Sequence, residues 1–509
     1  MHLSNLFRIF VYNYRGVEQL VARRAHNPKV AGSSPVPTTT ESHPSKVAFL
    51  FWGKHLDVAQ KSGEKRTMVM NGRWKRGMDG RCVPIYLYQY AVPDSSGTWE
   101  GRRGRKRFYF PFALTLVFVL LFALPLSAEP LLCGIDRLEA TGCRELSGLK
   151  VGLITNVAGV NRTGEPDYAV MLRSGVRLKF LMAPEHGFAA DIEAGKKVAS
   201  TVVADSLPVF SLYGASRKPD VRLLKTIDIL VFDLQDVGTR CYTYISTMNN
   251  AMGASEEAGI PFMVLDRPNP IAPLQSGGFM VKPGYNSFVG AVPVPFIHSM
   301  TVGEIALFLK ETRYKKLDLR VIPMQGYQRD RFADDYPDFR FSTPSPNIRS
   351  VSTAILYPAT VFLEATTVSE GRGTDAPFMQ FGAPFIKSSE LALAMKEFHL
   401  AGVVFDTLSF RPLSGKFRGE QCHGLKLAVT DRNIFNPFRT AVSILLALQR
   451  FYPGQIGLDK GGVFFDKLAG TPLFREMLRK QMPLEAIMEE SERQVEQFNR
   501  TNPAKRLYP

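Results

Sequence analysis

The chain has 509 residues, of which 45% are hydrophobic and 22% charged, with 41 glycines and 34 prolines. This balance is ordinary for a globular protein and excludes a collagen, a low-complexity scaffold and a polytopic membrane protein. The net charge of +16 suggests nucleic-acid binding, but residues 1–128 hold 19 Lys and Arg against 7 Asp and Glu, whereas residues 129–509 hold 44 against 40. The excess charge belongs to the N-terminal quarter, so we expect no nucleic-acid partner for the folded body.

The first hundred residues have the features of a spurious or disordered extension. They contain all three tryptophans and show no sustained helical or strand period. Residues 16–37 resemble the translation of a transfer-RNA gene read in the wrong frame or strand. We therefore expect a misplaced start site, and no function for residues 1–100.

Residues 101–128 have the pattern of a secretory signal. Basic residues over 102–107 precede a charge-free apolar run over 108–126, and Ser127 and Ala128 supply small side chains for cleavage. The run has 19 residues, close to the ~20 that span a bilayer, so an uncleaved anchor is the alternative. Either outcome predicts a periplasmic or secreted body whose only membrane contact is this segment.

The four cysteines of the body have no zinc or iron–sulfur spacing. Cys133 and Cys143 stand ten residues apart in a loop-like stretch and could form a disulfide in an oxidising compartment. Cys241 and Cys422 are expected to be buried small hydrophobic residues.

From residue 133 onward, apolar runs alternate with helix-length segments. The pattern predicts strands over 150–156, 177–183, 208–213, 226–233 and 260–266, and helices over 167–174 and 244–259. Apolar strands separated by helices are typical of a parallel sheet covered on both faces, so residues 129–290 are expected to form a Rossmann-like α/β domain. No G-x-G-x-x-G motif follows the first strand, and a dinucleotide cofactor therefore has no support.

A smaller α/β domain is expected over residues 291–509, after the Gly- and Pro-rich stretch 275–290. A helix over 298–310 should be capped by Thr301, with Glu304 completing a capping box. A possible edge strand covers 425–430, and amphipathic helices cover 437–451 and 483–499.

Polar side chains gather where the expected strands end. Ligands of parallel sheets bind beyond the carboxyl ends of the strands. This many carboxylates, amides and guanidinium groups exceeds what a structural rim needs, and we therefore predict a functional site there. The residues concerned are Asn156, Glu185, His186, Asp233, Gln235, Asp236, Arg240, Asp266, Arg267 and Asn269.

Each of these side chains has a functional and a structural interpretation. A partly desolvated Glu185 would suit general-acid catalysis, and a helix cap or a salt bridge is the structural alternative. His186 either orients a substrate or stabilises its loop. Asp233 is a second acid/base candidate, a sugar-hydroxyl acceptor or a loop cap. Arg240 and Arg267 either clamp a carboxylate or pair with neighbouring aspartates.

Other kinds of site have less support. Glu185, His186, Asp233 and Asp266 could hold a divalent ion, but no H-E-x-x-H or paired-histidine spacing is present. There is also no G-x-S-x-G nucleophile elbow and no P-loop. We expect a site that contains neither a metal nor a cofactor.

Several ordered motifs point to one family. They are GID at 134–136, PEHGF at 184–188, DLQDVGTR at 233–240 followed by Tyr242, DRPNP at 266–270, PSPN at 344–347 and SEGRGT at 369–374. On these motifs, residues 134–509 resemble the NamZ-type exo-β-N-acetylmuramidases, glycoside hydrolases long catalogued as a domain of unknown function. The resemblance implies a Rossmann-like domain joined to a smaller α/β domain, with the active site in the cleft between them. It also implies release of N-acetylmuramic acid from the non-reducing end of peptidoglycan glycans.

The resemblance implies roles for individual residues. Glu185 would be the general acid, and Asp233 is expected with it as a catalytic residue, although Glu364 or the substrate's own acetamido group could take the second role. Arg240 or Arg372 would hold the muramyl carboxylate. Together with the strand ends, the expected substrate-binding residues are Asn156, His186, Gln235, Arg240, Tyr242, Asp266, Arg267, Asn269, Asn347, Glu364 and Arg372.

Departures from the family pattern leave an alternative open. Ala189 and Ala190 stand where an Arg-Gly pair usually follows PEHGF. Ile297 and Ser299 flank a histidine that usually lies between Arg and Gly, and residues 364–367 read EATT where the family has EGTN. Lost arginines could change how the lactyl carboxylate is held. The alternative function is a non-catalytic envelope protein that binds glycans in a degenerate muramidase cleft; an amidase or esterase would need a nucleophile that the sequence does not reveal.

Overall fold

The computed structural model describes residues 129–197, 199–203, 207–214, 216–458, 462–502 and 506–509 in full. Upstream, it describes the backbone of β1 (Leu56–Asp57), β2 (Thr67–Arg76) and β3 (Cys82–Tyr90), an antiparallel sheet of order β1-β2-β3 where we expected no regular structure. The expected signal, residues 101–128, lies outside the described residues. The described residues from 129 to 509 belong to one compact unit. Among the described helices, none has the length and apolar character needed to cross a membrane.

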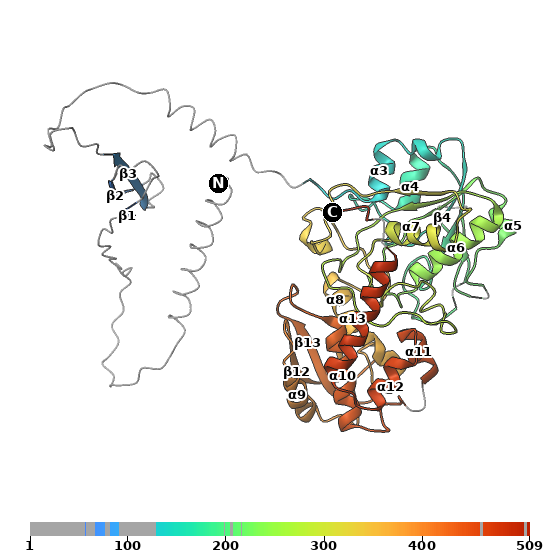
Figure 1. The fold of residues 1–509 in the computed structure, drawn as a ribbon. Helices are drawn as coiled ribbons and strands as arrows, with labels where there is room; N and C mark the ends of the chain where they lie inside the picture. The colour runs from blue at the N-terminus through green and yellow to red at the C-terminus, as the bar shows by residue number, and fades with distance from the viewer. Residues whose placement is uncertain are drawn as a thin grey trace, which may run out of the picture. The chain divides into compact units, whose positions relative to one another are not determined.

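A seven-stranded sheet organises the first part of this unit (Figure 1). Its order is β10-β9-β8-β4-β5-β7-β6, parallel except where β6 runs antiparallel to β7. All five expected strands occur in it, and the Rossmann-like α/β class is confirmed. The strands are β4 (Lys150–Ile154), β5 (Arg177–Ala183), β6 (Thr201–Val203), β7 (Leu207–Ser211), β8 (Ile229–Phe232), β9 (Phe262–Leu265) and β10 (Leu319–Ile322).

Helices bury both faces of this sheet because apolar side chains of each central strand point alternately to the two sides. In β8, Ile229 and Val231 pack with α3 and α4, whereas Leu230 and Phe232 pack with α6 and α7. The helices of this part are α3 (Gly134–Ala140), α4 (Asp167–Arg173), α5 (Val221–Leu224), α6 (Tyr244–Ala258) and α7 (Val302–Thr312).

Helix α7 begins as expected. Thr301 Oγ1 accepts the backbone N–H of Glu304 at 3.2 Å, and the Glu304 carboxylate accepts that of Thr301 at 3.0 Å. Both α7 and β10 lie beyond residue 290, where we expected the first domain to end. Because β10 pairs in parallel register with β9, the Rossmann-like part continues at least to Ile322.

Within its described residues, the second part holds a small antiparallel sheet and six α-helices. The sheet has the order β11-β13-β12, formed by β11 (Gln380–Ala383), β12 (Val403–Phe410) and β13 (Cys422–Val429). β13 pairs on both sides, so the strand expected over 425–430 is central and the prediction of an edge strand is wrong. The helices are α8 (Val351–Thr360), α9 (Ser388–Glu397), α10 (Pro437–Phe451), α11 (Gly462–Ala469), α12 (Leu473–Arg479) and α13 (Leu484–Thr501).

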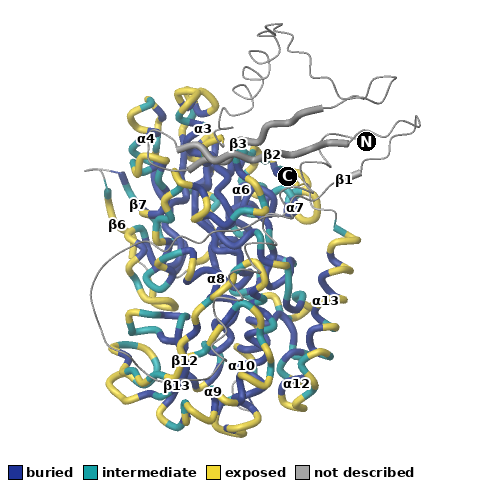
Figure 2. The backbone as a smooth tube through the Cα atoms, turned by 90° about the vertical axis from the view of Figure 1, so that its left-hand side faces the viewer, coloured by how far each residue is buried: buried dark blue, intermediate teal, exposed yellow. Residues whose placement is uncertain are grey.

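One apolar core continues from the α6 and α7 face of the large sheet into the second part. Phe296 stacks on Phe362 with ring centroids 4.4 Å apart, and Phe438 of α10 packs against both rings. Buried segments accordingly run through the whole unit (Figure 2). This continuous packing holds residues from both parts in place around one pocket.

The expected disulfide is absent, because Cys133 and Cys143 are both free and buried. Cys133 precedes the first residue of α3, and Cys143 follows the helix. A helix of seven residues is about 10 Å long, whereas disulfide-bonded Cα atoms lie about 4.4–6.8 Å apart. The short helix that the sequence pattern did not reveal therefore separates the two thiols.

Candidate active site

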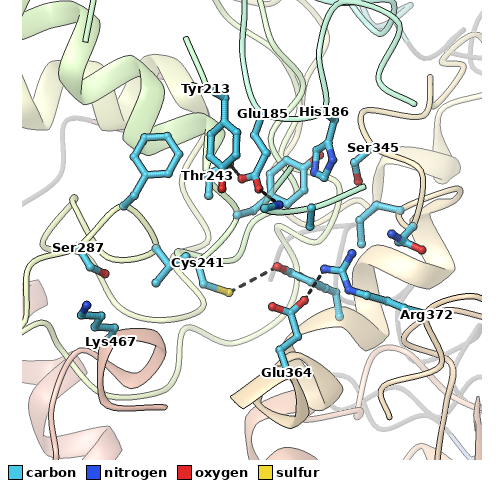
Figure 3. Close-up of a pocket in the computed structure, with 18 of the residues that line it drawn as sticks. Glu185, His186, Tyr213, Cys241, Thr243, Ser287, Ser345, Glu364, Arg372 and Lys467 are labelled. Carbon is cyan, nitrogen blue, oxygen red and sulfur yellow. Dashed lines mark hydrogen bonds and ion pairs between the residues drawn. The ribbon is translucent and has the colours of Figure 1, made fainter. Parts of the chain in front are cut away.

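A pocket of about 390 Å³ lies beyond the carboxyl end of β5 (Figure 3). Its wall combines the loops after β5 and β7, the chain leading into α6, and several segments of the second part of the unit. This is the edge at which parallel sheets bind ligands. Six predicted site residues line the pocket: Glu185, His186, Tyr242, Asn347, Glu364 and Arg372.

Glu185 is held in the pocket wall by hydrogen bonds to both carboxylate oxygens. Oε1 accepts the backbone N–H of Gly195 at 2.9 Å, and Oε2 accepts the Thr243 hydroxyl at 2.7 Å. The residue is only 6% exposed. Burial, and secondly the negative charge of Glu185 nearby, raises the pKa of the Tyr213 hydroxyl to about 12. Glu185 is therefore a largely desolvated carboxyl with a fixed orientation, as proton transfer to a bound substrate requires.

Glu364 faces Glu185 from the other side of the pocket (Figure 3). It lies in a 3-10 turn, Val361–Ala365, and forms an ion pair with Arg372. Arg372 also contacts Glu370 at 3.2 Å, and Lys416 contacts Glu370 at 3.0 Å, so that anions and cations alternate. Burial raises the pKa of Glu364, and the Arg372 charge opposes that rise. The pocket thus contains two carboxyl groups in different electrostatic environments, the arrangement from which acid and base roles arise.

His186 supplies a polar group beside Glu185. Burial is the main cause that lowers the pKa of His186, which favours the neutral imidazole. Nδ1 lies 2.7 Å from the Ile192 carbonyl oxygen and donates to it. A neutral ring that donates from Nδ1 presents Nε2 as an acceptor, for example to a sugar hydroxyl.

Aromatic side chains that the sequence analysis did not identify form one wall of the pocket. The rings of Tyr213 and Phe288 lie 5.7 Å apart, and the Arg217 guanidinium lies over both, 4.8 and 4.4 Å from their centroids. This wall therefore combines two aromatic rings with a guanidinium group, a mixture of apolar and polar surface typical of ligand pockets. Tyr213 ends the strand expected over 208–213 and Arg217 follows it, but no motif marked this strand end as a site. Phe288 lies in the Gly- and Pro-rich stretch 275–290, away from any expected strand end.

Seven predicted site residues lie outside the pocket lining, and their polar atoms bind other parts of the protein. Asp233, the expected second catalytic residue, is fully buried. Both of its oxygens accept from Arg267, with Nη2 to Oδ2 at 2.8 Å. A buried carboxylate needs such a partner, and this one gives Asp233 a structural role in place of the catalytic one. The seven residues are Asn156, Asp233, Gln235, Arg240, Asp266, Arg267 and Asn269.

Asp266 ties three segments together. Its carboxylate accepts the Thr301 hydroxyl and the Gly303 N–H, both at 2.8 Å, and the Tyr508 hydroxyl at 2.5 Å. Burial raises the pKa of Asp266 to about 6. Because these partners include the first turn of α7 and the end of the chain, Asp266 serves the fold at a position where we expected substrate binding.

The expected amide contacts to substrate are likewise used within the protein. The Asn156 amide group donates to Tyr244 Oη at 2.9 Å. The Gln235 amide group donates to the Pro268 carbonyl at 2.8 Å, and the Asn269 amide group donates to the Met300 carbonyl at 3.0 Å. A strand end thus predicts the edge of the sheet at which a side chain lies, but not whether the side chain turns toward a ligand or toward its own loop.

Arg240 cannot clamp a substrate carboxylate, because it is fully buried and its guanidinium serves the backbone. Nη1 donates to the carbonyls of Phe279 and Val294 at 2.6 and 3.0 Å. Nη2 donates to those of Leu468 and Ala469 at 3.1 and 2.8 Å. Burial lowers the pKa of Arg240 to about 10, so it remains charged at neutral pH. Arg240 therefore fastens the loop after β8 to two distant segments.

Arg240→Met is expected to lower the free energy of unfolding by at least about 3 kcal/mol, because it leaves four buried carbonyl groups without donors. Chemical denaturation followed by far-ultraviolet circular dichroism, which reports the loss of helices and strands, measures this decrease in stability. Arg222→Met is the matched control, because Arg222 is exposed and its ion-pair partner among the described residues is Asp220; a change within about 1 kcal/mol is expected there. An Arg240→Met protein of native stability with weakened substrate binding would contradict the structural role.

A second hollow of about 520 Å³ adjoins the pocket and shares Asn347, Glu364, Arg372 and Phe464 with it. Within the part of the chain that the structure describes, no three His, Cys, Asp or Glu side chains are grouped so that they could hold a metal ion. The arrangement is that of a two-carboxyl site open to a polar ligand larger than one sugar.

Comparisons with known proteins place the chain among characterised relatives. The family model described as exo-beta-N-acetylmuramidase NamZ, N-terminal, matches residues 151–352, and its C-terminal counterpart matches residues 355–508. The peptidoglycan beta-N-acetylmuramidase NamZ of Bacillus subtilis (strain 168) is 42% identical over 379 residues, which is 74% of this chain and 91% of that protein. Two crystal structures of DUF1343 family proteins from Bacteroides fragilis NCTC 9343 are similar, with TM-scores of 0.69 and 0.60. Their identities are 32% and 27%, over 74% and 75% of this chain and 99% of each of theirs.

Proposed function

This chain belongs to the NamZ family of exo-β-N-acetylmuramidases, and from that premise we propose that it releases N-acetylmuramic acid from the non-reducing end of peptidoglycan fragments. The observation that carries the proposal is the pair Glu185 and Glu364, which face each other across a pocket of about 390 Å³. A volume of that size lies within the range of small-ligand sites. The adjoining hollow offers room for the leaving part of the glycan.

Glu185 is the general acid of the proposed reaction, and it protonates the glycosidic oxygen as the bond to the anomeric carbon breaks. Thr243 supports this role through its hydroxyl, which donates to the carboxylate and can accept from the protonated acid. The hydrogen bond from Gly195 fixes the other carboxyl oxygen, so the proton donor keeps its direction throughout the reaction.

Glu364 takes the second catalytic role, in place of Asp233. Arg372 favours the ionised form of Glu364, and an ionised carboxylate can activate water or attack the anomeric carbon. Asp233 cannot do so while Arg267 occupies both of its oxygens. The substrate's acetamido group is the other possible participant, and the Glu364→Gln variant treated in the Discussion separates the two.

The departures from the family pattern lie outside the pocket lining, which weakens the alternative of a degenerate cleft. Ala189 is exposed, Ala190 is buried, and Ile297 belongs to the apolar core. None of the three lines either hollow. We also propose export to the periplasm or the cell exterior, on the composition of residues 101–128 alone.

The direct test is to incubate the protein with p-nitrophenyl N-acetylmuramide and with its N-acetylglucosamine counterpart. Release of nitrophenol from the muramide, and little from the glucosaminide, is the expected result. A folded protein that binds N-acetylmuramic acid but releases nothing from either compound would refute the proposed hydrolysis and favour the glycan-binding alternative.

A further inference from the structure

The pocket lining contains an exposed lysine whose ammonium group has no partner among the described residues. Lys467 lies on α11 and lines the pocket. Among the described residues, none forms a hydrogen bond or ion pair with its ammonium group. Of the other two cations of the lining, Arg372 pairs with two glutamates. Arg217 lies over two aromatic rings and forms no ion pair among the described residues, so it is the rival donor.

A hydroxyl without a partner lies beside this lysine. Ser287 lines the same pocket, and its buried Oγ has no hydrogen-bond partner. The backbone of Lys467 lies near this hydroxyl, because a Cβ at Gly290 would lie 3.3 Å from the Lys467 backbone carbonyl oxygen and 3.7 Å from Ser287 Oγ. Figure 3 shows both side chains together on the side of the pocket away from Arg372. Unpaired buried polar atoms are rare and call for an explanation, and a ligand oxygen would supply the missing partner.

A muramic acid residue differs from glucosamine by a 3-O-lactyl ether that ends in a carboxylate. That carboxylate requires a donor whose charge is not already neutralised, because a buried or half-buried anion without a partner is costly. Arg240 is excluded by its burial, and the charge of Arg372 is balanced by Glu364 and Glu370. Arg217 has no balancing carboxylate among the described residues, but its guanidinium is stacked on the Tyr213 and Phe288 rings. Lys467 and Ser287 together offer an ammonium and a hydroxyl, which both suit a carboxylate.

We propose that Lys467, assisted by the Ser287 hydroxyl, binds the lactyl carboxylate and thereby determines selectivity for muramyl over glucosaminyl ends. This inference deepens the proposed function and rests on it for the identity of the sugar. Lys467 would therefore act as a specificity-determining residue, and its loss should weaken the discrimination between muramyl and glucosaminyl ends.

The test measures binding of free N-acetylmuramic acid by calorimetry, with no turnover required. Lys467→Met should raise Kd about tenfold or more, the usual range for losing a charge-assisted hydrogen bond. The same substitution should leave Kd unchanged for the neutral amide of the lactyl group. Lys480→Met is the matched control, an exposed lysine after α12 that lines neither hollow. Unfolding curves of both variants should match that of the native protein.

Three results of these measurements would overturn the proposal, and one would support it while refuting the proposed function. An unchanged Kd for N-acetylmuramic acid in Lys467→Met would overturn the proposal, and so would a tenfold loss in Arg217→Met alone, which would move the carboxylate to the exposed guanidinium. A native protein that binds N-acetylmuramic acid no better than N-acetylglucosamine overturns it as well. Lys467-dependent binding without hydrolysis would support this inference and refute the proposed function, so the two failures are distinguishable.

Discussion

Glu185→Gln is expected to lower kcat on a muramyl disaccharide about a thousandfold, within the range that removal of a general acid produces. Glutamine keeps the size of the side chain and its carbonyl oxygen, and so retains one of the two hydrogen bonds from Gly195 and Thr243. It cannot supply a proton to the departing oxygen. Steady-state kinetics on the disaccharide, together with the thermal unfolding curve, measures the effect on chemistry apart from folding.

The leaving group distinguishes a general acid from a residue that merely shapes the pocket. Nitrophenolate departs without protonation, so Glu185→Gln should lose less activity on the p-nitrophenyl muramide than on the disaccharide. Glu257→Gln is the control, because Glu257 is an exposed residue that pairs with Lys218. An equal loss on both substrates would show that Glu185 positions the sugar and does not protonate it.

The pattern of apolar residues along the sequence predicted the strands that are buried on both faces of the sheet. A strand buried on both faces must be apolar throughout, and this made β8 and β9 visible as runs of four buried residues each. The seven-residue helix α3 and the half-buried strand β10 are too short or too mixed to show a period. Missing β10 placed the expected boundary too early, because that strand completes the sheet from beyond residue 290.

Two departures from the family pattern show why a motif change need not change a site. Ala190 and Ser299 adopt φ angles of 53° and 50°, in the left-handed region that favours glycine. The glycines expected from the family at both positions would fit the same backbone. These substitutions therefore keep the loop path at a modest strain cost, and neither residue lines the pocket.

The same strand-end rule that found Glu185 also suggested Asp233, and the sequence could not separate them. Both follow β-strands of the parallel sheet, and both are buried. The difference lies in their partners, since Asp233 meets a guanidinium 34 positions away in the chain, whereas Glu185 meets a hydroxyl and a backbone N–H. Such long-range pairing follows from the three-dimensional packing and has no local signature. Lys467 was missed for the same reason, because α11 reaches the pocket from near the end of the chain.

Glu364→Gln is expected to lower kcat by about 10²- to 10⁴-fold, because it removes the carboxylate that activates water or attacks the sugar. The ionised form is the active one in this role, so activity should fall as pH drops through the pKa of Glu364. Burial raises that pKa above the ordinary glutamate value of 4.5. The acid limb of the kcat/KM profile should therefore lie above pH 4.5 in the native protein and be absent from the residual activity of Glu364→Gln.

Arg372→Met tests whether the acid limb of the kcat/KM profile originates from Glu364 and its neighbouring charge. The Arg372 charge lowers the pKa of Glu364, so its removal should raise this pKa and move the acid limb to higher pH. Arg349→Met is a control on the neighbouring wall, because Arg349 lines only the adjoining hollow and donates to the Pro346 carbonyl. If the acid limb of the profile stays at the same pH in Arg372→Met, the limb originates from a titratable group other than Glu364. A near-native kcat in Glu364→Gln would exclude Glu364 as the second catalytic group. The substrate's acetamido group would then be the first candidate, ahead of Glu370 in the adjoining hollow, because the described lining of the pocket itself contains no third carboxylate.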